Sequence, residues 1–366
     1  MDKNKSGNTK KIILVLVLLL VIGGIFGVVG ILKKNSSLGV KIVKNDVSKI
    51  TLEDYQNDAL SLKKPAGWEV SAGGVGIYYA VRVYDPNDNN NQVFVMLKVQ
   101  PLLKSEAGKK TWQDYANLSG NQAQYKVFTS AVVLSNPTTE GFYLKFNDVA
   151  KYLTSIEPTL ANVKFPTFND FKKIEEFDSN ASMKSYALDS KVLRATFSNE
   201  NNKSGEGLFM ASIVNFGNSV IGMVDNSYYM VYDITAVTAA KDNFIDYKDI
   251  LLEVTKSIEF NDEYVKKTIN DSNAQTERSL ELNAQIQKSF DSYMSAWENR
   301  QTTYDIMSQK QSDATLGYER VYDTETGDIY KAYNGFTDDY SGNRYKSVTD
   351  DMYTKSTSGY IEKIGG

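Results

Sequence analysis

The most pronounced hydrophobic pattern in the chain is a continuous apolar run near its start, from Ile12 to Leu32. These residues contain no charged or polar side chain, and a helix of this length spans ~31 Å, close to the ~30 Å core of a bilayer. Lysine pairs flank the run at positions 10–11 and 33–34, and no small-residue cleavage site follows it. The pattern predicts an uncleaved transmembrane helix over residues 12–32, in contact with the lipid bilayer, rather than a cleaved signal peptide.

Lysines are nearly balanced on the two sides of this run, so the short tail before it decides the predicted orientation. We expect residues 1–11 to be a cytoplasmic tail and the bulk of the chain to be extracytoplasmic, in a single-pass protein of the cell membrane. Gly23 and Gly27 form a GxxxG pair that lets two helices approach closely. This pair favours a homodimer through helix–helix contact, although glycine is also common in membrane helices in general.

Alternating and aromatic-rich runs after the apolar segment predict an α+β fold. Residues 33–60 read as a stalk with a strand at 40–43, and residues 77–84 and 92–99 read as a hairpin around the polar turn 85–91. Thr111 is the expected cap of a short helix that ends at Leu118.

A second set of patterns runs from about residue 185 to 260. Strands are expected at 191–197, 207–214 and 228–237, followed by an amphipathic helix from Phe244 to Val254. We therefore expect residues 61–260 to form antiparallel sheet with flanking helices, either as one unit or as two halves that meet near 160–185.

Residues 261–366 change character, from a long polar helix that runs to about Gln311 to a tyrosine-rich β-hairpin at 317–333. The helix carries one narrow apolar stripe, which favours packing on the sheet and, as the alternative, pairing with a partner. The stripe comprises Leu282, Ile286, Phe290, Met294 and Trp297.

The region 60–260 resembles the PsbP-like α/β fold of photosystem accessory subunits and many bacterial secreted or periplasmic proteins. The residues that carry the resemblance near the start of this region are Pro65, Gly67, Trp68 and Val70. Those at its end are Ser257, Ile258 and Phe260. It implies an antiparallel sheet with flanking helices and transfers no active site, since the fold serves many roles.

The amino-acid composition limits the kinds of functional site that the chain can form. The chain has no Cys and no His, which excludes disulfides, lipid-modified cysteines, thiolate metal sites and histidine-based catalytic triads. The formal net charge of −4 and the absence of a basic patch argue against nucleic acid. We expect no catalytic residue, no cofactor and no metal.

Two weaker motifs carry little functional signal. Asp85, Asn87 and Asn89 have the spacing of calcium ligands, but Asn90 and Met96 replace the glycine and glutamate of such a loop, which favours a plain hairpin tip. The S-x-x-K match that starts at Ser61 lacks its companion motifs and is attributed to chance.

Tyrosines interleaved with polar residues in the tail are the most suggestive ligand or partner surface, because tyrosine presents a flat apolar face with a polar edge. The alternative is that they decorate small strands. The residues are Tyr318, Tyr322, Tyr330, Tyr333 and Tyr340.

These observations predict a membrane-anchored cell-envelope protein that acts as a non-catalytic binding or scaffolding module for a protein or glycan of the envelope. The alternatives are a carboxylate-dependent envelope hydrolase, which requires two acidic residues in one cleft, and an accessory subunit of a membrane complex.

Overall fold

The computed structural model describes residues 40–45, 47–217, 220–221, 223–261, 264 and 275–362. Within these ranges no helix is both long enough and apolar enough to cross a membrane. The predicted membrane helix at 12–32, with Gly23 and Gly27, lies outside the described residues. The described part of the chain is a mixed α+β structure, as the sequence predicts.

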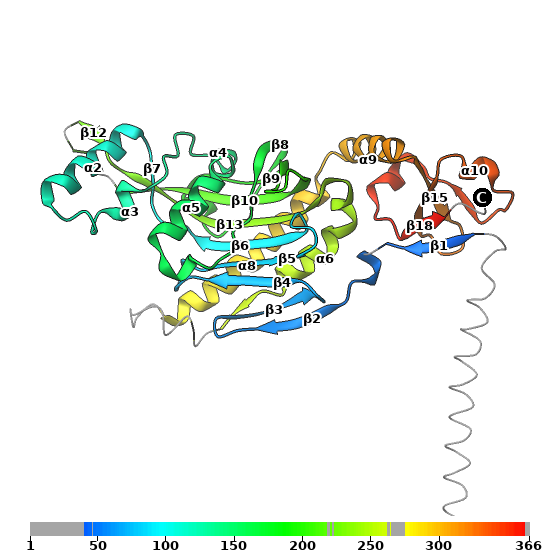
Figure 1. Cartoon of the computed structure of the whole chain (residues 1–366), viewed down its shortest axis with the longest axis horizontal. Helices are drawn as coiled ribbons and strands as arrows, with labels where there is room; N and C mark the ends of the chain where they lie inside the picture. The colour runs from blue at the N-terminus through cyan, green and yellow to red at the C-terminus, as the bar shows by residue number, and fades with distance from the viewer. Residues whose placement is uncertain are drawn as a thin grey trace, which may run out of the picture.

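The centre of the molecule is an eight-stranded antiparallel sheet with the strand order β4-β5-β6-β13-β10-β9-β8, in which β7 also pairs with β13. Figure 1 shows this sheet in the middle of an elongated molecule. Its strands are β4 (Glu69–Gly73), β5 (Ala80–Tyr84), β6 (Gln92–Lys98), β7 (Leu102–Leu103), β8 (Asn169–Asp178), β9 (Ala187–Ser198), β10 (Ser204–Phe216) and β13 (Tyr228–Ala240).

The predicted hairpins are present. β5 pairs with β6 around the polar turn, and β9 pairs with β10 and then β10 with β13. Strands from both sides of the 160–185 segment belong to this one sheet, because β6 pairs with β13.

Both faces of the sheet are covered, which explains why every residue of β5 and β6 is buried. One face packs against the helices α4 (Thr139–Leu144) and α5 (Phe146–Ile156) in a core rich in phenylalanine. The other face packs against α6 (Phe244–Lys256) and α8 (Gln275–Glu298). Burial on both sides removes the alternation of polar and apolar residues that an exposed sheet would show.

A three-stranded sheet, in the order β14-β3-β2, lies next to α6. Its strands are β2 (Leu52–Gln56), β3 (Leu60–Pro65) and β14 (Glu259–Phe260). Trp68, from the segment that carries the PsbP-like resemblance, is buried and its ring stacks against Tyr247 of α6 with centroids 6.4 Å apart. Gly67 adopts φ 82°, which a side chain would disfavour in this turn.

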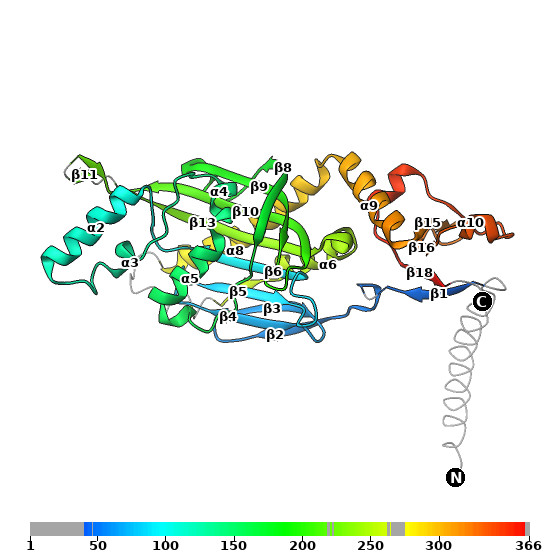
Figure 2. The ribbon, with the colours of Figure 1, turned by 45° about the horizontal axis from the view of Figure 1, so that its top comes forward.

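The tail forms a second, five-stranded sheet with the order β1-β18-β16-β15-β17. Its strands are β1 (Lys41–Lys44), β15 (Tyr318–Asp323), β16 (Ile329–Tyr333), β17 (Tyr345–Ser347) and β18 (Gly359–Glu362). The predicted strand at 40–43 is thus confirmed as β1, and it pairs antiparallel with β18 near the other end of the chain. The views of Figures 1 and 2 agree that this sheet lies at one end of the molecule and that α2 (Glu106–Ser119) and α3 (Lys126–Thr129) lie at the other.

The remaining elements are short. They comprise η1 (Val47–Lys49), η2 (Pro158–Leu160), η3 (Lys184–Tyr186), η4 (Lys241–Asn243), η5 (Asp350–Thr354), α10 (Phe336–Asp339) and the β11–β12 pair (Val220–Ile221 and Val224–Asp225).

Two helix predictions need correction. The helix expected to begin at Thr111 begins at Glu106, because Ser105 caps it by accepting a hydrogen bond from the Gly108 N–H at 3.0 Å. The Thr111 hydroxyl instead donates to the carbonyl of Ala107, one turn back within the helix.

The single long helix predicted from residue 261 is also wrong in extent. Among the described residues it is two helices, α8 and α9 (Thr302–Leu316), with a break at residues 299–301. Arg300 donates from Nη1 to the Trp297 carbonyl at 2.7 Å, so a side chain satisfies a backbone acceptor where α8 ends.

Candidate functional site

The five tyrosines predicted as a binding surface do not form one surface. Tyr330 is 7% exposed and belongs to the core of the five-stranded sheet, so the prediction of an exposed ligand surface is wrong for this residue. Tyr333 and Tyr340 are partly buried and pack on Phe336, with ring centroids 5.6 and 5.1 Å away. These three tyrosines fill the interior of a domain that has few aliphatic residues.

Tyr318 and Tyr322 lie on β15 and are half-buried. The Tyr318 ring lies 5.6 Å from that of Tyr360 on β18, and Tyr322 is opposite Ile329 in the register of β15 with β16. The structure therefore separates the predicted set into core and sheet-face residues.

The apolar stripe of α8 packs inward. Ile286 and Trp297 are buried, and Phe290 and Met294 contact the same core, which confirms packing on the sheet for these four residues. The alternative, pairing of this face with a partner, stays a prediction, since Phe290 and Met294 are only partly buried. The Leu282 side chain lies outside the described side chains.

The weaker motifs resolve as local structure. Asp85 accepts a hydrogen bond from the Asn87 N–H at 2.9 Å within the loop, and the Asn89 amide donates to Glu200 in the turn between β9 and β10. These groups therefore hold the loop and link it to the neighbouring hairpin. Within the described ranges no three acidic side chains come together in a way that could hold a metal ion. Ser61 and Lys64 lie on strand β3 three residues apart, so they point to opposite faces and make no Ser–Lys dyad.

The most developed cavity lies between α8 and the end of the large sheet, and we call it the α8 cavity. Its volume is about 610 Å³, within the range typical of small-molecule sites. The lining residues are Ile77, Leu97, Lys98, Ser182, Met183, Tyr186, Tyr232, Ala284, Gln285 and Lys288.

Hydrogen bonds hold the walls of the α8 cavity in place. Gln285 on α8 donates from Nε2 to the Leu97 carbonyl at the end of β6, at 3.3 Å. The Asn180 N–H donates to the Ser292 hydroxyl of α8 at 2.8 Å, which ties the 179–186 segment to the same helix. Three parts of the chain that are distant in sequence are thus fixed around one space, so the cavity is preformed.

Asp233 lies on a β-bulge of β13, behind the part of the cavity wall that Met183 forms. The register of β10 with β13 shifts between Met210 and Ser212, and Asp233 takes the left-handed φ of 54°. Because of the extra residue, Val231 and Ile234 face the same core although they are three residues apart. A non-glycine residue in this conformation carries local strain, which is typical of positions that aim a side chain at a defined place.

The Asp233 carboxylate ends a buried row of hydroxyls. Its Oδ2 accepts from the Ser212 hydroxyl at 2.7 Å and from the Met183 N–H at 3.3 Å. The Ser212 oxygen lies 2.8 Å from that of Ser190, which lies 2.6 Å from that of Ser179. Since Ser212 donates to the carboxylate, its own oxygen accepts from Ser190, and Ser190 accepts from Ser179.

The Asp233 side chain is unusual in its burial. The residue is 1% exposed, and its Oδ1 has no hydrogen-bond partner in the described part of the chain. Burial raises the pKa of Asp233, while the bonds from Ser212 and Met183, the amide of Gln285 and the charge of Lys288 oppose that rise. The carboxylate therefore fixes Met183, a wall residue of the α8 cavity, from the protein side.

A second buried polar cluster, the Arg194 cluster, joins the start of α9 to the large sheet. Arg194 is 2% exposed, and its Nη2 lies 2.6 Å from Glu206 and 2.5 Å from Asp305. Asp305 also pairs with Arg300 at 2.6 Å, and Arg194 lies 3.6 Å from Glu175. Burial raises the pKa of Glu206, whereas the Glu206 and Asp305 carboxylates raise that of Arg194 despite its burial. The Arg194 guanidinium bridges the Glu206 and Asp305 carboxylates, an arrangement that suits anchoring rather than hydrolysis.

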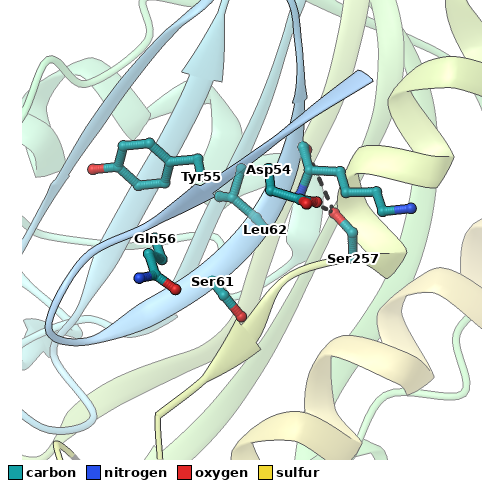
Figure 3. A pocket seen from close by; sticks show the side chains of 7 residues that line it. Asp54, Tyr55, Gln56, Ser61, Leu62 and Ser257 are labelled. Carbon is teal, nitrogen blue, oxygen red and sulfur yellow. Dashed lines mark hydrogen bonds between the residues drawn. The ribbon is translucent and has the colours of Figure 1, made fainter. Parts of the chain in front are cut away.

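A shallower depression of about 570 Å³ lies over β2 and β3, lined by residues that include Asp54, Lys63 and Ser257. The Ser257 hydroxyl, labelled in Figure 3, accepts a hydrogen bond from the Lys63 N–H at 2.8 Å. Ser257 thus extends the pairing of β3 beyond the two residues of β14. Most of the lining side chains are exposed, so the depression offers a polar surface without convergent groups.

The end of the molecule that carries α2 and α3 is rich in exposed apolar side chains. A ring stack runs from Trp112 to Phe128, with centroids 4.3 Å apart, and continues to Tyr228. Tyr115, Leu118, Phe216, Val220 and Met223 are the exposed members of this end.

Comparison with known proteins assigns the chain to no family. The chain matches no protein-family model, and no curated protein matches it.

Sequence patterns did not point to the α8 cavity. Its residues come from five separate segments, none with a recognisable motif, and the bulge at Asp233 lies inside a run that reads as a regular strand. The one available signal was an aspartate in the middle of an otherwise apolar strand, between Tyr232 and Ile234.

Proposed function

We propose that this protein is a membrane-anchored, extracytoplasmic binding module without catalytic activity, and that its ligand site is the α8 cavity. The single observation that supports it most is the preformed cavity, whose walls are fixed by the Gln285, Asn180 and Asp233 hydrogen bonds. A site held rigid before binding loses little entropy when a ligand enters.

The membrane part of the proposal rests on the apolar run 12–32. β1 begins at Lys41, nine residues after Leu32. Extended chain spans at most ~3.6 Å per residue, so the five-stranded sheet would stand within roughly 35 Å of the bilayer. The α2–α3 end would then face away from the membrane, since it lies at the opposite end of the molecule. We retain the PsbP-like fold for residues 60–260 as part of the same proposal.

The two alternative functions receive less support. A hydrolase needs two accessible carboxylates, whereas the buried pair Glu206 and Asp305 is bridged by Arg194. An accessory subunit would have used the apolar stripe of α8, which packs on the sheet instead.

The absence of cysteine gives a direct test, because any introduced cysteine is the only thiol in the chain. Leu118, which is 88% exposed, and Ser6, in the predicted cytoplasmic tail, serve as the two positions. On whole cells an impermeant maleimide should label Leu118→Cys but should label Ser6→Cys only after lysis. The opposite pattern, or recovery of the intact chain in the supernatant of a high-speed spin, contradicts the membrane proposal.

The cavity is tested with Ser182→Cys in the full-length chain. A small methanethiosulfonate reagent should modify this thiol, and the added Ala284→Trp substitution should slow the reaction because it fills the space from α8. Leu118→Cys with and without Ala284→Trp is the control and should react equally. A Ser182→Cys rate that Ala284→Trp leaves unchanged shows that the cavity is not an open site.

A further inference from the structure

A buried charged cluster joins α9 to the five-stranded sheet, and we call it the Asp313 cluster. Asp313 and Gln309 come from α9, Arg320 from β15 and Lys331 from β16. Each of the four is at most 5% exposed. Arg320 and Lys331 are opposite each other in the register of β15 with β16. Two cations of the sheet therefore meet a carboxylate of the helix where water hardly reaches them.

The two oxygens of the Asp313 carboxylate have different surroundings. Oδ2 accepts a hydrogen bond from Arg320 Nε at 2.6 Å, and the same guanidinium also donates to Gln309. Oδ1 is buried and accepts no hydrogen bond within the described part of the chain. Lys331 Nζ lies 3.8 Å from this oxygen, beyond hydrogen-bond distance. An ammonium and a carboxylate thus face each other without the hydrogen bond that usually offsets the loss of water around a buried ion pair.

An ammonium and a carboxylate held in this way can condense to an amide. In the Lys331–Asp313 pair, the Nζ–Cγ bond forms and the Cγ–Oδ1 bond breaks. Oδ1 leaves as water with two of the three ammonium protons, and the third proton stays on the amide nitrogen. The reaction needs no oxidant, reductant or further reactant. Its product is neutral, so it removes two charges that the fold keeps away from water.

The neighbouring groups favour this reaction. Arg320 holds Oδ2, the oxygen that becomes the amide carbonyl, and its positive charge stabilises the negative charge that develops there during the attack. Burial raises the pKa of Asp246 on α6, although Thr357 donates two hydrogen bonds to its carboxylate. The charges of Lys331 and Arg320 also act on this carboxylate, so a second carboxyl group is available to carry a proton toward Oδ1.

We propose that Lys331 and Asp313 are joined by an isopeptide bond in the folded protein. The bond connects β16 directly to α9, and β16 in turn pairs with β18, which pairs with β1. It fastens the sheet that contains both ends of the described chain, in a protein that has no cysteine for a disulfide. The α8 cavity and the membrane anchor play no part in this inference.

The test is mass spectrometry of the full-length chain, purified in detergent and then denatured. We expect an intact mass that is lower than the mass of the sequence by one water. Trypsin should no longer cut after Lys331, and it should release a branched product in which residues 311–320 are joined to residues 321–344. An intact mass without the loss of water, or complete cleavage after Lys331, overturns the proposal.

Two lysine variants assign the lost water to this pair. Lys331→Arg keeps a cation in the cluster but cannot form the bond, so its mass should equal that of its sequence. Lys310→Arg is the matched control on α9, because Lys310 pairs with Asp350 at the surface, and it should keep the loss of water. A loss that persists in Lys331→Arg lies elsewhere in the chain and refutes the proposal. The native chain decides the question by itself even if Lys331→Arg does not fold.

The role of Asp246 has its own test. Asp246→Asn removes the proton carrier, and the fraction of crosslinked chain in freshly purified protein should fall below that of the native chain. An unchanged fraction overturns the role of Asp246 in forming the bond.

Discussion

Removal of Arg194 is the sharpest test of how the helical region is held on the sheet. The Arg194 cluster contains the carboxylates of Glu175, Glu206 and Asp305 and the guanidinium groups of Arg194 and Arg300. Arg194→Met keeps most of the apolar length of the side chain and removes its charge. Asp305 would then stay buried with Arg300 as its remaining guanidinium, whereas Glu206 would lose the guanidinium that pairs with it.

The expected cost is large because the partners cannot reach water. The Asp305 side chain is 0% exposed and that of Glu206 is 3% exposed. Removal of one partner from a buried ion pair typically costs about 3–5 kcal/mol, so we expect Arg194→Met to lower the free energy of unfolding by that amount. Urea titration followed by circular dichroism measures it.

A rescue variant shows whether the cost is electrostatic. Adding Glu206→Gln and Asp305→Asn to Arg194→Met removes the uncompensated charges, and most of the lost stability should return. Lys310→Met is the matched control on α9, because its pair with Asp350 is exposed and should contribute less than about 1 kcal/mol. A loss below about 1 kcal/mol for Arg194→Met, or no recovery in the triple variant, refutes the reasoning.

Three further predictions concern Asp233 and the tail. Burial raises the pKa of Asp233 above its ordinary value of 3.8, so the native chain loses stability as pH rises and the buried carboxyl ionises. Asp233→Asn cannot ionise and should gain thermal stability relative to the native chain as pH rises from about 4 to about 7. Asp233→Val should lose stability at both pH values, because valine is strained at φ 54°. Phe336→Ala should cost about 3–5 kcal/mol and speed amide exchange in β15–β18 but not in β5 or β6, since Phe336 is the fully buried centre of the tail core. Gly359→Ala should release β1, seen as faster exchange of its amides, because the added carbon would lie 2.2 Å from the Val43 carbonyl oxygen; unchanged exchange would show that the pairing tolerates it.

Much of the secondary structure could be predicted from local patterns. The hairpins at β5–β6, β9–β10 and β15–β16 follow from β-branched and aromatic runs interrupted by polar turns, which act within a few residues. Helix ends were harder, since the cap at Ser105 is only one of several serines and threonines near α2, and the break after Trp297 depends on Arg300.

The sequence by itself determined the lack of histidine and cysteine chemistry, the α+β class and the positions of the hairpins, because composition and short-range periodicity act locally. Tertiary structure decided that Tyr330 is buried, that β1 pairs with β18 although they are far apart in the chain, and that Lys98, Met183 and Gln285 line one cavity. Those outcomes depend on contacts between segments far apart in sequence, and a single register shift at the β13 bulge sets the direction of Asp233. No local pattern encodes such a shift, since one extra residue reverses the face of every side chain beyond it.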